Sequence, residues 1–495
     1  MIYRKKMNLF VIILLALALT ACSTNPQGGS GEGEETIADS DSEQIVLRIM
    51  DWSDSSKVIR EQFHKQFEAR HPNIKIEYTQ LTIDQFNSTV LTAIQSGEAP
   101  DLFPVPPTMK LSTAVSQGWF QPLDPFIDDS FKNSLVEGTF TEGTTMLNGN
   151  IYTIPEGQSL PTTLVFYNKK LFKEAGLDPE HPPKTYSEFR EAARKITEAG
   201  KGEYYGIIEG GKQMGRWTAI VQDWSSLGGS GLTSLSPVSL VTKTTAYDSE
   251  PVKQLFQLFQ NLAEDGSYHP QTPTISAPEA RALFAQEKAG FIVQGSWNVG
   301  VWNSQAPSLD YGVMAPPVPD SGRKGSIPLN TASPWLSISA QSEHPQEAGL
   351  YLKELFGNSE YQQKMVESGI GFSVVKGVTE QYTSLPQLKD YYDLSKEFGR
   401  IAPNPIVRNS STGTVFENFK DVKPNAGELL GATVSKAISN PAESLTKLSV
   451  QMNEAWTAAI EAARAKGTDV SAEDFLFPNW DPYQDYKQQD YVNLP

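Results

Sequence analysis

Residues Leu164–Thr197, LVFYNKKLFKEAGLDPEHPPKTYSEFREAARKIT, carry the clearest secondary-structure signals in this chain of 495 residues. The apolar run Leu164–Tyr167 predicts a short strand, and Asn168 is placed to cap a helix directly after it. Gly176 follows that helix at a position where a residue without Cβ can turn left-handed. After two prolines, Thr185 begins a T-x-x-E capping box. The stretch therefore predicts a strand, a helix, a turn and a second helix.

The same stretch resembles the YNK…F…G…PP…T signature of bacterial extracellular solute-binding proteins, the sugar-type receptors of ABC importers. Four further segments resemble that family in the same order: Ala99–Phe103, Gly118–Ile127, Ala289–Trp297 and residues 331–372. Each motif is weak alone, and their order along the chain carries the resemblance.

The first block of the globular part alternates strands and helices. Strands are predicted at 44–50, 74–78 and 99–103. The helix between the first two is expected to bury Val58, Ile59, Phe63 and Phe67, and Asp84 is expected to cap the next helix. This β-α-β-α-β order predicts an α/β fold with a parallel sheet covered by helices on both faces.

The resemblance implies a two-lobed periplasmic-binding-protein-like fold of type II, in which each lobe is discontinuous and a hinge joins the two. By matching, lobe 1 comprises 42–155 plus 331–372, lobe 2 comprises 160–328 plus 376–480, and 481–495 is a C-terminal tail. The chain is expected to cross between the lobes at Thr153–Gln158, Pro328–Ser333 and Gly371–Lys376. These crossings are rich in Gly, Pro or small polar residues, as hinges often are.

The N-terminal region predicts a lipoprotein. Residues 1–21 combine a basic start with an apolar run of signal-peptide length, and Leu19-Thr20-Ala21-Cys22 resembles a lipobox. Cys22 is therefore the expected lipidation site, with palmitate among the acyl chains, and 22–41 is expected to be a disordered Ser/Gly/Glu-rich tether. The alternative is a signal anchor with an incidental cysteine. The lipoprotein interpretation predicts a protein on the extracytoplasmic face of the cell membrane.

Composition excludes several classes of function. The formal net charge of −17 argues against binding to nucleic acid or directly to an anionic membrane surface. The single cysteine excludes a disulfide framework, and the five histidines are too scattered for a catalytic metal site. No cofactor or metal is expected, although acidic pairs such as Asp128-Asp129 leave a structural Ca²⁺ open. The stretch Gly206–Gln213 has P-loop spacing but lacks the Ser/Thr that binds Mg²⁺.

Candidate ligand-binding residues are aromatic and polar side chains at the ends of predicted elements. Indole rings stack on the apolar faces of sugars, while carboxylates and amides bind hydroxyl groups. The candidates are Asp51, Trp52, Asp54, Gln80, Asp101, Trp217, Trp224, Trp297, Asn298, Trp335 and Phe416. The alternative for each aromatic is packing between elements, and for Asp101 a structural role is favoured. Trp297 matches a sugar-stacking tryptophan of the family.

Three functions compete. The first, implied by the resemblance, is a monomeric, non-enzymatic binding protein that closes two lobes around a carbohydrate and delivers it to ABC permease subunits. The second is a lipid-anchored glycoside hydrolase, which would need two carboxylates flanking one bond. The third is a receptor for a non-sugar solute on the same scaffold. The sequence does not identify the sugar, its length or linkage, or the permease.

Overall fold

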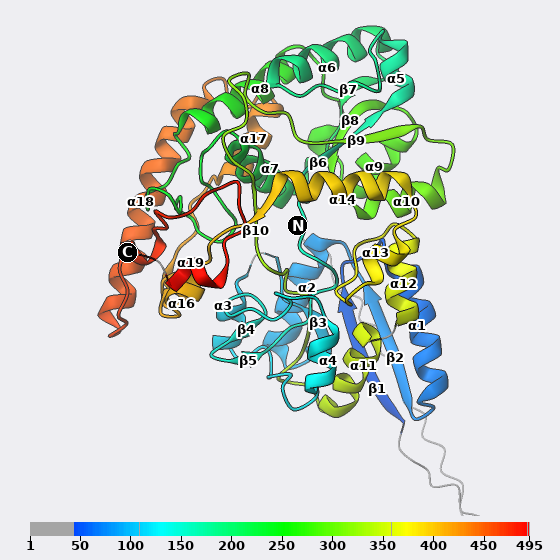
Figure 1. Ribbon diagram of the computed structural model, residues 1–495, viewed down its shortest axis with the longest axis vertical. Helices are drawn as coiled ribbons and strands as arrows, with labels where there is room; N and C mark the ends of the chain where they lie inside the picture. Colours follow the sequence, from blue (N-terminus) through cyan, green and yellow to red (C-terminus); the bar gives the residue numbers. More distant parts are fainter. Residues whose placement is uncertain (1–43, 108, 358, 493, 495) are drawn as a thin grey trace, which may run out of the picture. The chain divides into compact units, whose positions relative to one another are not determined.

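The computed structural model describes residues 44–495 except 108, 358, 493 and 495 (Figure 1). The predicted signal peptide, the tether and Cys22 lie outside the described residues. Within the described part of the chain, no helix has the length and apolar character that a membrane span requires.

The structure confirms the secondary structure predicted for Leu164–Thr197. Strand β6 (Leu164–Asn168) runs into α5 (Lys169–Glu174), and the Asn168 side chain accepts a hydrogen bond from Leu171 N at 2.9 Å. Gly176 has a φ of 70°, in the left-handed region. Thr185 and Glu188 form the capping box of α6 (Tyr186–Gly200). Local capping chemistry therefore sets the boundaries of these elements.

The lobe 1 sheet has the strand order β11-β3-β1-β2. Its strands are β1 (Ile45–Asp51), β2 (Ile74–Gln80), β3 (Leu102–Pro104) and β11 (Leu336–Ile338). Strand β1 is parallel to β2 and β3, as predicted, whereas β11 pairs antiparallel with β3. Strand β11, which comes from a segment far along the chain, adds an antiparallel edge to the predicted parallel sheet. The helices and short strands of this lobe are α1 (Lys57–Arg70), α2 (Ile83–Ser96), α3 (Leu111–Ser116), α4 (Asp129–Ser134), β4 (Met146–Leu147), β5 (Asn150–Ile151), α11 (Pro345–Gly357) and α12 (Ser359–Glu367).

Two local predictions in lobe 1 are wrong. Val58 is 64% exposed, because α1 buries the face that carries Ile59 and Phe63 together with the charged Arg60. Asp84 lies in the first turn of α2, and the cap is Thr82, which forms a capping box with Gln85. Both errors arose one or two residues from a helix start, where the sequence offers several polar candidates.

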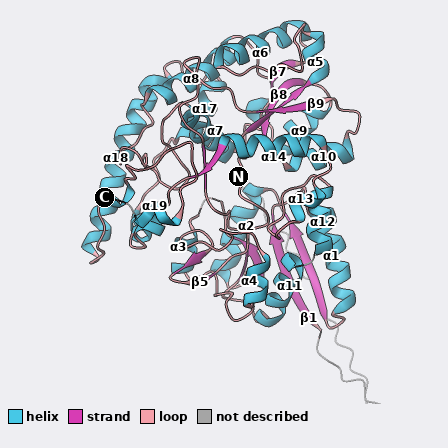
Figure 2. Cartoon of the chain, viewed as in Figure 1, coloured by secondary structure: helices cyan, strands magenta, loops and turns pink. Residues whose placement is uncertain are grey.

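The lobe 2 sheet has the order β7-β8-β6-β9. Its strands are β7 (Tyr205–Ile207), β8 (Ala289–Gln294), β6 and β9 (Tyr311–Met314). Strand β6 is antiparallel to both neighbours, and β7 is parallel to β8. Helix α6 lies beside β7 and β8, as Figure 2 shows with the strands in magenta. The remaining elements up to residue 475, whose assignment to lobe 2 is a prediction, are α7 (Met214–Leu227), α8 (Glu250–Glu264), η1 (Thr272–Thr274), α9 (Ala277–Ala285), α10 (Trp297–Gln305), β10 (Ile327–Leu329), α13 (Val378–Tyr382), α14 (Pro386–Phe398), β12 (Gly399–Ile401), α15 (Pro405–Arg408), α16 (Thr412–Asn418), α17 (Ala426–Val434), α18 (Pro441–Ala465) and η2 (Ala472–Phe475).

Each sheet has its own apolar core, as an α/β two-lobed fold requires. One core gathers residues from 47–154 and 335–374, and another gathers residues from 165–314 and 426–452. Phe372, placed by prediction at the end of lobe 1, packs in a third cluster with Leu164 and Tyr391 of lobe 2. The exact lobe boundaries remain a prediction.

The described residues of the predicted C-terminal tail are packed against lobe 2. Helix α19 (Gln488–Val492) lies in this segment, and Tyr486 is buried against Leu240 and Phe477. The backbone N–H of Tyr486 donates to Ile401 O at 2.9 Å, and the Asp485 carboxylate accepts from Ile401 N. The segment therefore covers β12, which pairs with β10 close to the second predicted crossing.

The capping box of α6 is a testable contribution to stability. We expect Thr185→Ala to lower the free energy of unfolding by about 1 kcal/mol, because it leaves the backbone N–H of Glu188 without its acceptor. Urea denaturation measures the change. In the control Thr92→Ala, the lost hydroxyl only donates back to Ser88 O on exposed α2, so a change below about 0.5 kcal/mol is expected. Equal losses would contradict the capping account.

Candidate functional site

The carboxyl end of β1 is held by a buried network of charged side chains. Arg60 on α1 has no exposed side-chain surface and contacts Asp51 Oδ2 through Nη1 at 3.3 Å. Asp51 Oδ1 accepts hydrogen bonds from Ser53 N and Tyr78 OH, each at 2.9 Å. Burial raises the pKa of Asp51, and the Arg60 charge opposes that rise. Asp51, a predicted ligand residue, is therefore committed to internal contacts.

The same network reaches the first predicted crossing through Glu156. Glu156 Oε1 accepts from Arg60 Nη2 at 2.5 Å and from the Ser56 hydroxyl at 3.0 Å. Arg60 thus links β1, α1 and the crossing segment. Neither Arg60 nor Glu156 was among the predicted site residues, although an arginine within the apolar stripe of α1 was a signal in the sequence.

The loop after β1 places an aromatic cluster beside this network. The ring of Trp52 lies 4.6 Å from that of Trp335 and 4.7 Å from that of Phe86, both edge-on. Trp335 is 7% exposed and Trp52 is half-buried. The structure therefore brings two of the predicted tryptophans together, with Trp52 as the more accessible ring.

In lobe 2 the turn between β8 and α10 presents Trp297. This half-buried indole lies 5.5 Å from the guanidinium carbon of Arg216, a cation–π distance. Arg216 donates to the carbonyl of Thr162, and the neighbouring Thr163 hydroxyl donates to Asp223 Oδ2 at 2.7 Å. An aromatic ring, a guanidinium and a carboxylate are thus gathered around the start of β6.

Arg281 on α9 joins the two lobes at this point. Its Nη2 lies 2.6 Å from Asp54 Oδ2 on the loop after β1, and its Nη1 lies 3.5 Å from Asn298 Oδ1 beside Trp297. The contact brings the Trp52–Asp54 loop of lobe 1 to the Trp297–Asn298 turn of lobe 2. We call this set the Arg281 junction: Trp52, Asp54, Arg281, Trp297 and Asn298. Four of its five members were predicted site residues, and Arg281 was missed.

Two predicted tryptophans lie elsewhere. Trp217 and Trp224 on α7 are 1% and 0% exposed and both pack edge-on against Phe259 in the lobe 2 core. The indole N–H of Trp224 donates to Thr163 O at 3.0 Å. The structure does not bring either ring to the Arg281 junction, because helical spacing places both on the buried face of α7. Through this hydrogen bond Trp224 holds Thr163, whose hydroxyl donates to Asp223.

The remaining predicted residues have local partners. Asp101 is 3% exposed and accepts from Arg48 N and the Ser342 hydroxyl, at 2.8 and 2.6 Å, which agrees with its favoured structural role. Gln80 donates to Leu81 O at 2.6 Å. Phe416 packs edge-on against Phe475, and Lys110 Nζ lies 5.6 Å from its ring centre. These contacts leave their roles in ligand binding as predictions.

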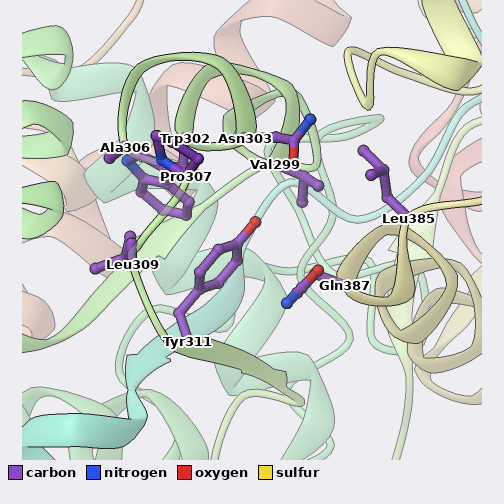
Figure 3. A pocket seen from close by; sticks show the side chains of 9 residues that line it. All are labelled: Val299, Trp302, Asn303, Ala306, Pro307, Leu309, Tyr311, Leu385 and Gln387. Carbon is purple, nitrogen blue, oxygen red and sulfur yellow. The ribbon is translucent and has the colours of Figure 1, made fainter.

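Two small cavities occur in lobe 2. The first, of about 70 Å³, is lined by Trp302 and Tyr311 among others (Figure 3). The second, of about 200 Å³, lies where α7 meets α17 and has Trp217 in its wall. Ligand pockets usually span about 300–1,000 Å³. Both cavities are therefore small for an oligosaccharide, and the candidate site remains the Arg281 junction.

Buried carboxyl groups flank Arg216. Glu209 is 1% exposed, and its Oε1 accepts from Val293 N at 2.6 Å. Burial raises the pKa of Glu209 to about 8 and that of Asp223 to about 7, although the Arg216 charge opposes both shifts. Burial also lowers the pKa of Arg216. The raised pKa values favour the protonated forms of these two carboxyl groups, which can donate as well as accept hydrogen bonds.

The described residues offer no candidate metal centre: nowhere among them do three or more His, Cys, Asp or Glu side chains gather as ligands. His64 is buried against Tyr351, and burial together with the Arg60 charge lowers its pKa to about 3. The acidic pair Asp128-Asp129 is used locally, since the Asp128 side chain caps α4 and pairs with Lys353.

A family model described as bacterial extracellular solute-binding protein matches residues 52–362. A multiple sugar-binding protein of Streptococcus mutans is 25% identical over 394 residues, covering 77% of this chain and 85% of the relative. An sn-glycerol-3-phosphate-binding periplasmic protein of Escherichia coli is 32% identical over a shorter stretch of 143 residues, 28% of this chain and 32% of the relative.

Solved structures share the fold. An ABC substrate-binding protein of Listeria monocytogenes in complex with cycloalternan has a TM-score of 0.64 at 16% identity, covering 83% of this chain and 98% of that chain. A solute-binding protein of Thermotoga lettingae bound to α-D-tagatose also has a TM-score of 0.64, at 20% identity, covering 83% and 100%. At these identities the likeness establishes the two-lobed architecture.

The buried Glu209 carboxyl gives a pH prediction. Because its pKa is about 8 in the folded state against 4.5 as the ordinary value, the folded protein retains a proton that the unfolded chain releases. The free energy of unfolding should fall as pH rises from about 4.5 to 8, by up to about 1.4 kcal/mol per pH unit. Glu209→Gln can keep the bond from Val293 and has no proton to lose. Its stability relative to the wild type, measured by urea denaturation at pH 5 and pH 8.5, should therefore grow with pH. If the free energies of unfolding of the wild type and Glu209→Gln changed equally between pH 5 and pH 8.5, the raised pKa of Glu209 would be contradicted.

Proposed function

Since the chain belongs to the bacterial extracellular solute-binding proteins, we propose that it is the substrate-binding protein of an ABC importer and that it captures a sugar or an oligosaccharide. The two lobes close around the solute by bending at the crossings, and contacts with both lobes stabilise the closed form. The permease subunits then receive the solute.

The observation that carries the proposal is the composition of the Arg281 junction. Trp52 comes from lobe 1 and Trp297 from lobe 2, so each lobe contributes one half-buried indole to the junction. Beside Trp297 lie the guanidinium of Arg216 and the Thr163–Asp223 pair. Sugars need this combination, because their ring faces are apolar and their edges carry hydroxyl groups that donate and accept hydrogen bonds.

The ligands named for the relatives favour a carbohydrate as the solute. The Streptococcus mutans relative is a multiple sugar-binding protein, and both structural neighbours were solved with sugars bound. The Escherichia coli relative, by contrast, binds sn-glycerol-3-phosphate. A phosphorylated polyol is therefore the alternative solute, and the same binding assay can include it.

We also propose that the protein has no enzymatic activity. The matched relatives are named as binding proteins. A glycoside hydrolase needs one free carboxylate as nucleophile or base and another as acid. At the junction, Asp54 is paired with Arg281; Asp223, which lies outside the junction, accepts from the Thr163 hydroxyl.

We further propose that Cys22 carries a lipid anchor, that this anchor attaches the protein to the extracytoplasmic face of the cell membrane, and that the protein is a monomer. A tethered receptor stays close to its permease, and the lipobox-like sequence before Cys22 supports this arrangement. We expect Cys22→Ser to abolish metabolic labelling with fatty acids in a bacterial host. Labelling that persists in this variant would contradict the anchor.

The proposed function predicts saturable binding without turnover. We expect intrinsic tryptophan fluorescence to change saturably with at least one member of a panel of mono- and oligosaccharides, because Trp52 and Trp297 are partly exposed. No new reducing ends should appear on prolonged incubation. The panel includes sn-glycerol-3-phosphate, and a response to that compound alone would replace the carbohydrate assignment. Release of reducing ends would instead establish a hydrolase.

Trp297 is the most informative single position. We expect Trp297→Ala to weaken binding of the responding sugar by about 2 kcal/mol or more, roughly thirtyfold in Kd, as for other aromatic anchors. Isothermal titration calorimetry measures the loss. Trp480→Ala, which removes a half-buried indole of the C-terminal cluster, serves as the matched control and should leave the affinity unchanged. Equal affinities of Trp297→Ala and the wild type would make Trp297 a packing residue.

A further inference from the structure

Arg281 contacts both halves of the candidate site at once. Its guanidinium pairs with Asp54 of lobe 1 at 2.6 Å and approaches Asn298 of lobe 2 at 3.5 Å. The Arg281 side chain is 12% exposed and that of Asp54 is 41% exposed, so the ion pair is partly shielded from water. Residues 54 and 281 are 227 positions apart in the chain, so the ion pair joins the loop after β1 to helix α9.

The backbone at Arg281 is fixed before the ion pair forms. Helix α9 starts at the Ser276–Glu279 capping box, and Ala280 and Phe284 anchor its apolar face. The indole N–H of Trp302 donates to the Arg281 carbonyl at 3.2 Å. Arg281 is therefore presented from a rigid element, which lowers the entropy lost when it binds Asp54.

A second contact between the lobes lies at another strand end. Lys110, in the segment after β3, donates from Nζ to Ser234 O of lobe 2 at 2.7 Å and lies over the Phe416 ring. The loops that follow β1 and β3, neighbouring parallel strands, thus each carry one charged side chain that reaches lobe 2. Other contacts also join segments assigned to the two lobes, such as Gly300 N–H to Gly369 O at 3.0 Å and Asn404 Nδ2 to Thr144 Oγ1 at 3.4 Å. The Arg281 contact is the one that joins Asp54 to Asn298, beside Trp297.

We propose that Arg281 is a positioning residue of the binding site: it holds the lobes together through Asp54, keeps Asn298 beside Trp297, and thereby sets the fraction of closed molecules before solute binds. The inference rests on the proposed function in taking lobe closure as the binding motion. A contact made in one conformation and absent from the other shifts the equilibrium by its own free energy. Asp54, predicted as a ligand residue, acts in this conformation through Arg281.

Small-angle X-ray scattering of the full chain without solute tests this inference. In Arg281→Met, the ratio of open to closed molecules should rise about three- to tenfold, as loss of a partly shielded charged hydrogen bond implies. The radius of gyration should increase accordingly. Asp54→Asn should give the same change. The wild type should approach the variants as NaCl is raised from 50 to 500 mM, since salt screens the pair.

The charge swap Asp54→Arg/Arg281→Asp separates the ion pair from a general packing effect. It should restore a radius of gyration near that of the wild type. The control Lys353→Met removes an ion pair of similar length, Lys353–Asp128 at 2.7 Å within lobe 1, and should leave the radius unchanged. Circular dichroism confirms that each variant is folded, and amide exchange at 295–299 should quicken in Arg281→Met.

The inference is overturned if folded Arg281→Met and Asp54→Asn scatter like the wild type, or if the swap does not reverse the change. Because no solute is added, these results do not depend on which compound binds. Failure of the sugar panel would therefore remove the carbohydrate assignment and leave the scattering result standing.

Discussion

The architecture of lobe 1 depends on a buried positive charge. Arg60 has no exposed side-chain surface, and a guanidinium in such a place is tolerated only when anions compensate it. Asp51 at the end of β1 and Glu156 at the first crossing supply the compensation. The pairing therefore fixes three segments at once: the strand end, the first helix and the start of the hinge. Trp52 and Asp54 follow directly on this anchored strand end, so their positions rest on the same charge.

Lobe 2 differs from lobe 1 in the direction of its strands and in the charged groups near their ends. Its sheet is largely antiparallel, and the β8–α10 turn presents Trp297 where Arg216 and Asp223 gather near the start of β6. Here the carboxyl groups of buried Glu209 and half-buried Asp223 both feel the charge of Arg216, and desolvation raises their pKa values. The two lobes therefore differ at the junction. In lobe 1 the ion pairs of Arg60 lie next to Trp52 in the chain, and in lobe 2 carboxyl groups with raised pKa values lie near Arg216, which contacts Trp297. Arg281 links the two lobes at the junction.

Much of the fold could be predicted because its signals are local. Asn168, Thr185 and Ser276 cap the helices that follow them, as their neighbours in sequence indicate. The site was less predictable. Trp217 and Trp224 are seven residues apart, a spacing that places both rings on the buried face of one helix, and this signal favoured packing over ligand contact. Arg281 and β11 could not be inferred in this way, since their partners lie more than 200 residues away in the chain.

We propose that the solute binds at the Arg281 junction, between Trp52 of lobe 1 and Trp297 of lobe 2. A crystal structure of the protein with the responding sugar tests it most directly. The account predicts the sugar ring against the Trp297 indole, with hydroxyl groups within hydrogen-bond distance of Arg216 or Asp223. Sugar bound instead in the cavity beside Trp217, or at the surface of one lobe without contact to the other, would contradict it.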